Sequence, residues 1–410
     1  MGAPRDDQPR TEPLSTEATA GLVRERGMRL SSDDLKMFFG EAHHTLADRL
    51  RAAAMRFLRI EEPSAYPTEL ERDRAAAAAL AETGLFELVV PDGQIDTRAL
   101  VLAREMLGYV SARADSIFAV QGLGTHAIVL AGNPEQRAQL KAFSRGAGIA
   151  AFALTEPEAG SDVASIQTRA APTADGYRLD GDKLFISNLG IADHATVIAS
   201  TEPTHGSAGL TAFWVPLDTP GVTVVPLVAT APHPIGALEL RGVEVPASAR
   251  IGDVGKGMRL AMQTLDAFRV SVGAAAVGMA RRALDEALAF VTHRRQFGKL
   301  LSEQPLVQAH LADMVVDLDA ARLLVLRAAH AKDTTGGKVT TEVSIAKLGA
   351  TEAASRVIDR AVQLFGGRGV MAGAVVEHLY RAVRPLRIYE GTSEIQRTII
   401  GRALAQGAGT

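Results

Sequence analysis

A single carboxylate stands in an unusual setting near the end of the chain. In the stretch LRIYEGTSEIQ, apolar residues lead directly into Glu390, and a glycine follows it at once. Ser393 and Gln396 have the spacing of a capping box, which predicts that a helix begins there. One interpretation is a solvated loop acid near the positive end of that helix. The alternative is a base that faces an apolar pocket, where burial makes a carboxylate more basic.

Two earlier motifs are suited to holding a flat, polar ligand. ALTEPEAGSD supplies the hydroxyls of Thr155 and Ser161, among small residues that let a ligand approach the backbone closely. KLFISN predicts a strand with Phe185 and Ser187 on one face, where a ring and a hydroxyl can hold a heterocycle. The alternatives are an ordinary polar turn and an ordinary core strand.

Three motifs in the second half of the chain carry arginines and glycines. HRRQFGK ends a long helical segment, and Arg294 can bind a pyrophosphate there. The alternative interpretation is a helix C-terminus, with cations that complement the helix dipole and Gly298 as the residue that ends the helix. QLFGGRG is first of all a helix stop, because no strand precedes it as in a dinucleotide fingerprint. LDAFR places Asp266 and Arg269 where they can pair, and a surface ion pair is the simpler interpretation.

The elements that must position these residues fall into zones that predict domain boundaries. Residues 1–30 are polar and proline-rich and predict a disordered tail. Residues 31–148 predict an α-helical domain. Residues 149–250 carry short alternating runs between turn signals, which predict a small β-barrel or sandwich. Residues 251–410 are helical again, so the fold class is mainly α with a central β-domain.

The helical zones predict particular helices. Ser32, Asp33 and Asp34 can begin a helix that runs toward Leu58. Residues after Pro305 repeat apolar side chains in steps of four and three, which predicts one seam of an antiparallel bundle. The remaining predicted helices lie near 69–84, 97–113, 115–131, 134–144, 258–293, 341–365 and 393–405.

The composition limits the classes of function that the chain can have. Its 410 residues are 47% hydrophobic, and a net charge of −3 gives no basic field for nucleic acid or anionic lipid. The absence of cysteine excludes disulfides, thiolate nucleophiles and cysteine-ligated metals, and we expect no metal site. The N-terminus lacks the apolar core of a secretory signal, and no apolar run approaches membrane-spanning length. We therefore expect a cytoplasmic protein without membrane insertion.

The order and spacing of these motifs together are more specific than any one of them. LTEPEAGSD, KLFISN, RRQFG, QLFGGRG and IYEGTSEIQ, set on a helices–β–helices order, resemble the acyl-CoA dehydrogenase family over about residues 31 to 406. The resemblance implies an N-terminal helical domain, a middle β-barrel and a C-terminal four-helix bundle. It also implies FAD bound between the middle and C-terminal domains of a homotetramer or homodimer, with a neighbouring subunit contributing.

The resemblance assigns roles residue by residue. Glu390 matches the catalytic base, which removes the α-proton of an acyl thioester while the β-hydrogen leaves as hydride to the flavin. Phe268, Arg269 and Gly391 fall near the acyl group. Phe268 also stands where some relatives carry the base, and it cannot act as one. The positions that match FAD contacts are Thr155, Ser161, Phe185, Ser187, Arg294, Gln296, Phe297, Gln363, Gly366, Gly367, Thr392 and Glu394.

Several departures from the family pattern leave the acyl group open. Phe185 stands in place of a common tryptophan, and Ala382 in place of a frequent aspartate. The segment VVPDGQIDTRAL lacks the usual Gly-Gly turn, in a region that shapes the acyl pocket. The sequence therefore predicts dehydrogenation of an acyl-CoA, with an electron-transfer flavoprotein as acceptor. The alternatives are a carrier-protein thioester as substrate, an oxidase that uses O₂, and a structural or DNA-binding oligomer derived from the family.

Overall fold

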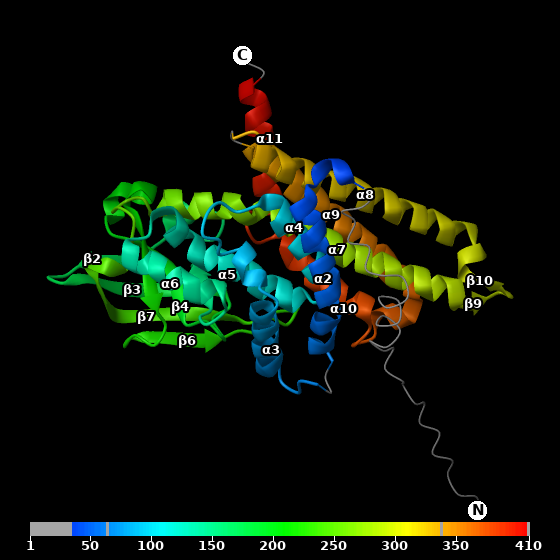
Figure 1. Ribbon diagram of the computed structural model, residues 1–410, viewed down its shortest axis with the longest axis horizontal. Helices are drawn as coiled ribbons and strands as arrows, with labels where there is room; N and C mark the ends of the chain where they lie inside the picture. The colour runs from blue at the N-terminus through cyan, green and yellow to red at the C-terminus, as the bar shows by residue number, and fades with distance from the viewer. Residues whose placement is uncertain (1–34, 63–64, 337–338, 408–410) are drawn as a thin grey trace, which may run out of the picture.

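The computed structural model describes residues 35–62, 65–336 and 339–407, so the predicted N-terminal tail lies outside the described residues. The chain folds mainly into helices around one central sheet domain, which confirms the predicted fold class (Figure 1). The first helical layer consists of η1 (Lys36–Phe38), α2 (Glu41–Ile60), α3 (Glu69–Glu82), η2 (Leu85–Leu88), α4 (Thr97–Val110), α5 (Ala112–Ala131) and α6 (Pro134–Ser144).

The first long helix begins later than the sequence predicts. Its N-cap is Gly40, whose N–H donates to Nδ1 of His43, three residues on. The predicted start at Ser32 to Asp34 lies outside the described residues, and the helix that runs toward Leu58 begins at Glu41, after a separate 3₁₀ turn at residues 36–38 and the extended Phe39. The His43 ring thus has the role that a glutamate or glutamine side chain at the third helical position has in a capping box.

The β-domain is one sheet around its own core. Its strands are β1 (Ala150–Ala153), β2 (Arg169–Pro172), β3 (Gly176–Ser187), β4 (His194–Ser200), β5 (Leu210–Pro216), β6 (Val222–Pro226), β7 (Ile235–Pro246) and β8 (Arg250–Ile251). They pair in the order β6-β7-β3-β2-β4-β5-β8, and β1 adds to β4. Every strand from β1 to β7 contributes apolar side chains to one buried cluster, so the sheet curls around a single core. Short 3₁₀ turns η3 (Val163–Ser165), η4 (Pro203–Gly209) and η5 (Ala247–Ala249) join the strands.

The C-terminal part is a bundle of long helices. It contains α7 (Gly257–His293), α8 (Pro305–Thr334), α9 (Thr340–Phe365), α10 (Val375–Val383) and α11 (Ser393–Gly407), with the hairpin β9 (Arg295–Gln296) and β10 (Lys299–Leu300) after α7. The turns η6 (Leu301–Glu303), η7 (Gly366–Val370) and η8 (Arg384–Arg387) complete it. The predicted seam on α8 is buried from Met314 to Ala328, which confirms the pattern there. Val307 and Leu311 are half-buried, where α8 runs out past the other helices (Figure 1).

One helix contradicts the expectation that no apolar run reaches membrane-spanning length. By length and composition α5 is apolar enough to cross a membrane, but 78% of its 18-residue window is buried inside the protein. It packs on β1 and on α7, and Gln121 ties it to the β-domain through hydrogen bonds to Gly148 O and Ala150 N–H at 2.8 Å each. The burial of α5 therefore agrees with a core helix that joins the helical layer to the sheet.

Candidate active site

Glu390 lies on a turn that three side chains hold from behind. Its φ is +53°, a conformation that non-glycine residues rarely adopt, and Gly391 follows with φ +91°. The Nε of Arg269 donates to the carbonyl of Glu390 at 3.0 Å. Lys347 Nζ and Gln396 Nε2 donate to the carbonyl of Gly391 at 2.7 and 3.0 Å. The turn is thus fixed through its backbone, which leaves the carboxylate free to act.

The carboxyl group of Glu390 is buried without a hydrogen-bond partner for its Oε2 among the described residues. Burial raises the pKa of Glu390, and the cations of Arg104, Arg269 and Lys347 oppose that rise. Burial also lowers the pKa of Lys347 to about 8, against the attraction of Glu390. An unpaired, shielded carboxyl with a raised pKa has the properties of a general base.

A buried ion pair lies near Glu390. Arg104 donates to both oxygens of Asp115, at 2.9 and 2.7 Å, and to the hydroxyl of Ser271 at 3.0 Å. Both charged side chains are almost fully buried. The pair brings α4, α5 and α7 together, and both of its charges act on the carboxyl of Glu390. Sequence reasoning missed it, because nothing in the spacing of Arg104 and Asp115 marks them as partners.

Phe268 is completely buried beside the Glu390 turn. Its ring meets the His126 ring edge-on at 5.6 Å between centroids, and it occupies the space that a side chain at Gly122 would need. Burial lowers the pKa of His126 to about 4, so this ring is neutral at physiological pH. Phe268 therefore fills space between α7 and α5 and presents no exposed contact surface.

In the β-domain, the predicted ligand-binding loop and strand lie together. The carbonyl of Thr155 accepts from Leu184 N–H at 2.9 Å, which places the loop after β1 beside the end of β3. Buried Lys183 donates to Glu156 at 2.8 Å and to Leu154 O at 3.1 Å. The Glu156 carboxylate also accepts from two backbone N–H groups, those of Gln167 and Thr168. Glu156 and Lys183 were not predicted, although each stands inside a motif that was.

The end of β3 departs from regular strand geometry. The register with β7 shifts between Lys183 and Ile186, and Phe185 has φ +60° with 63% of its surface exposed. Ser187 is half-buried and pairs with Ile235, while the buried side chain of Asn188 donates to Ala150 O at 3.0 Å. A β-bulge thus directs an aromatic ring out of the sheet, which is a device typical of binding sites.

The remaining predicted residues lie at the far end of the bundle. Phe297 and Gly298 both have positive φ and form the two-residue turn of the β9–β10 hairpin, so the prediction of Gly298 as a helix stop is wrong. Phe297 is 95% exposed. The Phe290 and Phe365 rings stack at 4.4 Å, which brings the ends of α7 and α9 together. The exposed residues gathered at this end are Arg294, Gln296, Phe297, Gln363, Gly366 and Gly367.

Residues with strained backbone conformations coincide with several of the predicted site residues. In the described ranges, the residues other than glycine with positive φ are Phe185, Asn188, Phe297 and Glu390. Such conformations cost roughly 1–3 kcal/mol each and persist where a function or dense packing demands them. Three of the four are predicted site residues. Figure 1 shows that β3 and the β9–β10 hairpin lie at opposite ends of the molecule, so one chain does not bring all of the predicted site residues together.

Comparison with known proteins decides the family. The N-terminal, middle and C-terminal domain models of acyl-CoA dehydrogenase match residues 34–145, 151–243 and 255–405. The chain is 36% identical to the probable acyl-CoA dehydrogenase FadE25 of Mycobacterium tuberculosis, over 89% of this chain and 95% of the relative. The chain belongs to the acyl-CoA dehydrogenase family. It is an oxidoreductase that acts on CH–CH bonds.

Other relatives broaden the chemistry. Acryloyl-CoA reductase (NADH) of Anaerotignum propionicum is 35% identical, over 87% of this chain and 93% of that protein. The structure of butyryl-CoA dehydrogenase from Megasphaera elsdenii superposes with a TM-score of 0.82 at 33% identity, covering 90% of this chain and 99% of that one. A structure of PigA with FAD and proline superposes with a TM-score of 0.80 at 26% identity, covering 90% and 98%.

Acyl-CoA dehydrogenases depend on FAD, and the residues present here fit that cofactor. An exposed aromatic ring at Phe185 offers a flat wall, and the hydroxyl side chains of Thr155 and Ser187 are half-buried on adjoining segments. A side chain at Gly366 or Gly367 would meet open space, so none of the described residues fills the volume beside them. Within the described part of the chain, no three His, Asp or Glu side chains gather as a metal site.

The start of α11 corrects one prediction. Thr392 is the cap, since its hydroxyl accepts from Ile395 N–H at 3.3 Å. The predicted capping box of Ser393 and Gln396 is wrong. Ser393 donates instead to Glu352 at 2.6 Å, and Gln396 turns back to the carbonyls that follow Glu390. Glu394 is exposed in the first turn of α11.

Proposed function

We propose that this enzyme removes two hydrogens from the α- and β-carbons of an acyl-CoA thioester and releases the 2-enoyl-CoA. Glu390 takes the α-hydrogen as a proton. FAD, when bound, would supply the redox chemistry as the acceptor of the β-hydrogen and its two electrons. Two electrons and two hydrogens thus leave the acyl chain, one hydrogen as a proton and the other with both electrons. The observation that carries the proposal is the buried, unpartnered Oε2 of Glu390 on a strained turn.

The surroundings of Glu390 support its role as the base. Because burial raises its pKa, the carboxylate is more basic than an exposed one and better matched to a weakly acidic α-hydrogen. The three donors on the carbonyls of Glu390 and Gly391 keep the turn in place when the charge changes. Arg269 and Gly391 would therefore shape the acyl end of the site, with Phe268 behind the wall.

The FAD site would draw on two subunits. Thr155, Ser161, Phe185 and Ser187 would hold the flavin and its phosphates in one subunit. Thr392 and Glu394 lie next to the catalytic turn and would also approach FAD. A neighbouring subunit would supply the other end of the cofactor, from Arg294, Gln296, Phe297, Gln363, Gly366 and Gly367.

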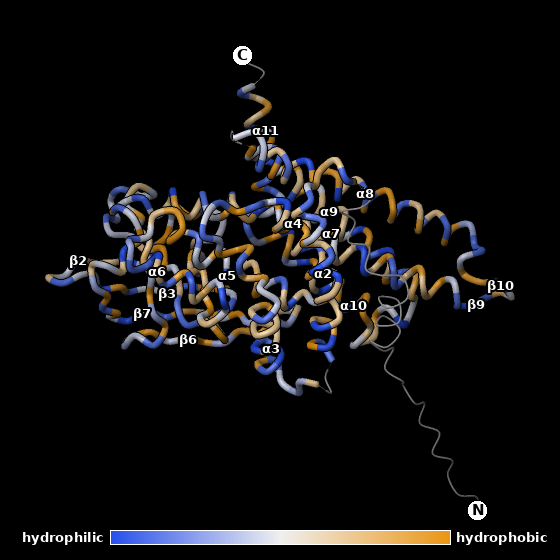
Figure 2. Tube along the Cα trace, viewed as in Figure 1, coloured by the Kyte–Doolittle hydropathy of each residue, from blue (hydrophilic) through white to orange (hydrophobic). Residues whose placement is uncertain are grey.

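A homotetramer or homodimer follows from that division. Large apolar side chains remain exposed along α8, at Leu306, Val315, Val316 and Leu323. Figure 2 shows hydrophobic residues on successive turns of α8 out to its free end. Covering them with a second copy of the chain would bury this surface and bring a hairpin to a neighbour's flavin. An electron-transfer flavoprotein would then take the electrons, since one relative is named a subunit of a caffeyl-CoA reductase-Etf complex.

The reverse direction is the second candidate. One relative is named a reductase, and the same geometry can return a proton from Glu390 to the α-carbon of an enoyl thioester. Which direction prevails depends on the reduction potential of the bound FAD and on the electron partner.

An anaerobic titration tests the proposal. Purified protein with bound FAD is mixed with straight-chain, branched, alicyclic and aryl acyl-CoA thioesters, and loss of the flavin absorbance is followed. We expect at least one thioester to bleach the flavin. A protein that stays colourless with added FAD would refute the flavoenzyme proposal. If the protein is yellow and only a carrier-protein thioester bleaches it, the substrate is a carrier-protein thioester and not an acyl-CoA. If it produces stoichiometric hydrogen peroxide in air, it is an oxidase.

A further inference from the structure

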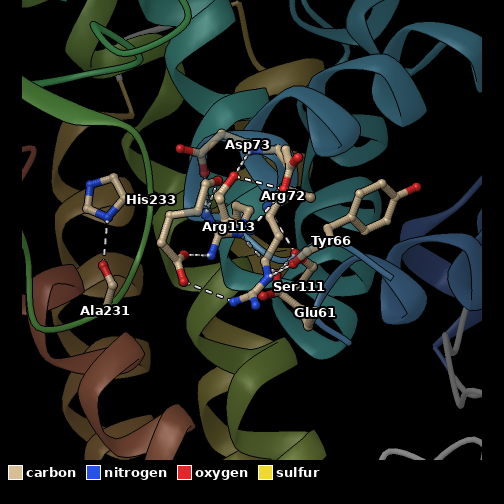
Figure 3. A network of polar contacts seen from close by, with 12 residues as sticks. Glu61, Tyr66, Arg72, Asp73, Ser111, Arg113, Ala231 and His233 are labelled. Atoms are coloured by element: carbon tan, nitrogen blue, oxygen red, sulfur yellow. Dashed lines mark hydrogen bonds and ion pairs between the residues drawn. The ribbon is translucent and has the colours of Figure 1, made fainter. Parts of the chain in front are cut away.

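His233 lies in the segment between β6 and β7 and contacts the hydroxyl of Ser187 on β3. Its Nδ1 is 3.0 Å from the carbonyl oxygen of Ala231 (Figure 3). A carbonyl oxygen only accepts hydrogen bonds, so Nδ1 carries a hydrogen. In the neutral ring, Nε2 then has a lone pair and no hydrogen.

The Nε2 of His233 lies 3.3 Å from Oγ of Ser187. Because Nε2 can only accept in this tautomer, the Ser187 hydroxyl must be the donor. Burial lowers the pKa of His233, and the cation of Arg113 adds to the effect, so the ring is neutral at physiological pH. Arg113 is itself held by Glu69 and Asp73 in the buried network of Figure 3.

The backbone fixes this contact. Asn188 N–H donates to Pro234 O at 2.7 Å, and Ser187 is in register with Ile235. The residues that follow Ser187 and His233 are therefore joined directly. This pairing keeps the backbones of Ser187 and His233 side by side, so the ring and the hydroxyl stay within reach of each other.

We propose that His233 is a positioning residue that turns the Ser187 hydroxyl hydrogen toward its own Nε2, so that the Ser187 oxygen can only accept a hydrogen bond from FAD. This inference rests on the proposed function and on the family resemblance, by which Ser187 takes the place of a threonine or serine that bonds near N5 of the flavin. Oxidised flavin has a bare nitrogen at N5, and reduced flavin has an N–H there. An acceptor at Ser187 therefore stabilises the reduced form selectively, which shifts the equilibrium toward oxidation of the thioester.

The experiment measures how far FAD is reduced at equilibrium with a reference dye in the holoenzyme. His233→Phe removes the acceptor and frees the hydroxyl to donate to oxidised N5. Because the variant loses an acceptor for reduced FAD and gains a donor to oxidised FAD, we expect roughly a tenfold shift toward oxidised FAD, or about 30 mV for two electrons. His233→Gln, whose amide oxygen can accept from Ser187, should restore most of the difference.

Two controls separate positioning from general structural damage. In a Ser187→Ala background, His233→Phe should cause no further shift, because the hydroxyl that it orients is gone. His205→Phe, at an exposed histidine of the same domain, should leave the equilibrium unchanged. If His233→Phe does not retain FAD, His233→Ala is measured and should shift the equilibrium in the same direction.

The outcomes distinguish this inference from the proposed function. An unchanged equilibrium in His233→Phe, in an enzyme that still oxidises a thioester, would overturn the inference alone. The same would follow from equal shifts in the presence and absence of Ser187. If His233→Phe shifts the equilibrium as expected but no thioester reduces the enzyme's FAD, the inference is supported and the proposed acyl-CoA substrate is refuted.

Discussion

The Nε of Arg269 donates to the backbone carbonyl of Glu390 across 3.0 Å, while its Nη1 lies 2.7 Å from Asp266. Arg269 therefore holds the peptide of the proposed base, and its charge lies close enough to oppose the rise in the carboxyl pKa. The predicted ion pair of Asp266 and Arg269 is present, but Arg269 is buried, so the interpretation as a surface ion pair is wrong.

Loss of Arg269 should slow the chemical step. Arg269→Met removes a charged donor worth about 1.5–3 kcal/mol, so we expect the rate of FAD reduction to fall roughly 10- to 100-fold. FAD content should stay unchanged. Stopped-flow measurement of flavin bleaching checks this, with Asp266→Asn as the matched control that keeps the Arg269 donor. An unchanged rate of FAD reduction in Arg269→Met would show that the Glu390 turn keeps its conformation without Arg269.

Glu390 should impose a pH dependence on the rate and on stability. The base acts when ionised, so FAD reduction should fall on the acid side of a pKa above the ordinary 4.5, and Glu390→Gln should abolish it while keeping FAD. Because the folded-state pKa is raised, ionisation destabilises the fold above pH 4.5. Glu390→Gln lacks that cost, so its melting temperature should exceed that of wild type at pH 8 and match it near pH 4. Equal differences at both pH values would contradict a raised pKa.

The buried pair of Lys183 and Glu156 should control both stability and FAD retention. Burial lowers the pKa of Lys183 to about 8, and a neutral amide at position 156 leaves this buried cation without its carboxylate partner. We expect Glu156→Gln to cost about 3–5 kcal/mol, and Lys183→Met less, because Glu156 keeps two N–H donors. Denaturant unfolding and flavin absorbance after gel filtration measure the two effects.

A matched control lies on the same strand. Arg178 and Asp180 form an ion pair with both side chains about half exposed, so Arg178→Met should change stability by less than about 1 kcal/mol. If Arg178→Met were as damaging as Lys183→Met, then charge on β3, rather than the buried pair, would explain the loss.

Much of this architecture follows from local patterns in the sequence. Helix periods and glycine stops act over a few residues, and they locate α7 and the start of α8 to within a few positions. The motif around Glu390 likewise predicts its own turn. Thr392 caps α11 in place of Ser393, because the Ser393 hydroxyl donates to the carboxylate of Glu352 on α9. Glu352 is 41 residues away in the sequence, so no local pattern predicts this contact.

The parts that sequence reasoning missed are long-range polar contacts. Arg104 and Asp115 lie on consecutive helices, and Ser271 meets them from 167 residues beyond Arg104. His233 meets Ser187 only because β3 and β7 are neighbours in the sheet. Such pairs depend on the tertiary arrangement, since each partner taken alone has an ordinary local role.

Subunit mixing should show whether one FAD site is built from two chains. Glu390→Gln and Arg294→Ala each disable a different part of the site, and on the proposed arrangement these parts belong to different subunits. In a mixed pair, the subunit that keeps Glu390 receives an intact Arg294 from its partner. One of the two sites in each mixed pair of a twofold-symmetric assembly is therefore intact, so mixed pairs should have about half of the wild-type activity.

Coexpression of the two variants with different tags, followed by purification through both tags, checks this prediction. The control combines Glu390→Gln with Thr155→Ala, two residues assigned to the same subunit's site, and no site in that mixed pair is intact. Rescue in the first mixture and none in the second is the result that a shared site requires. Failure of both mixtures would place Arg294 beside the flavin of its own chain, against the wide separation of the hairpin and β3 within one subunit (Figure 1).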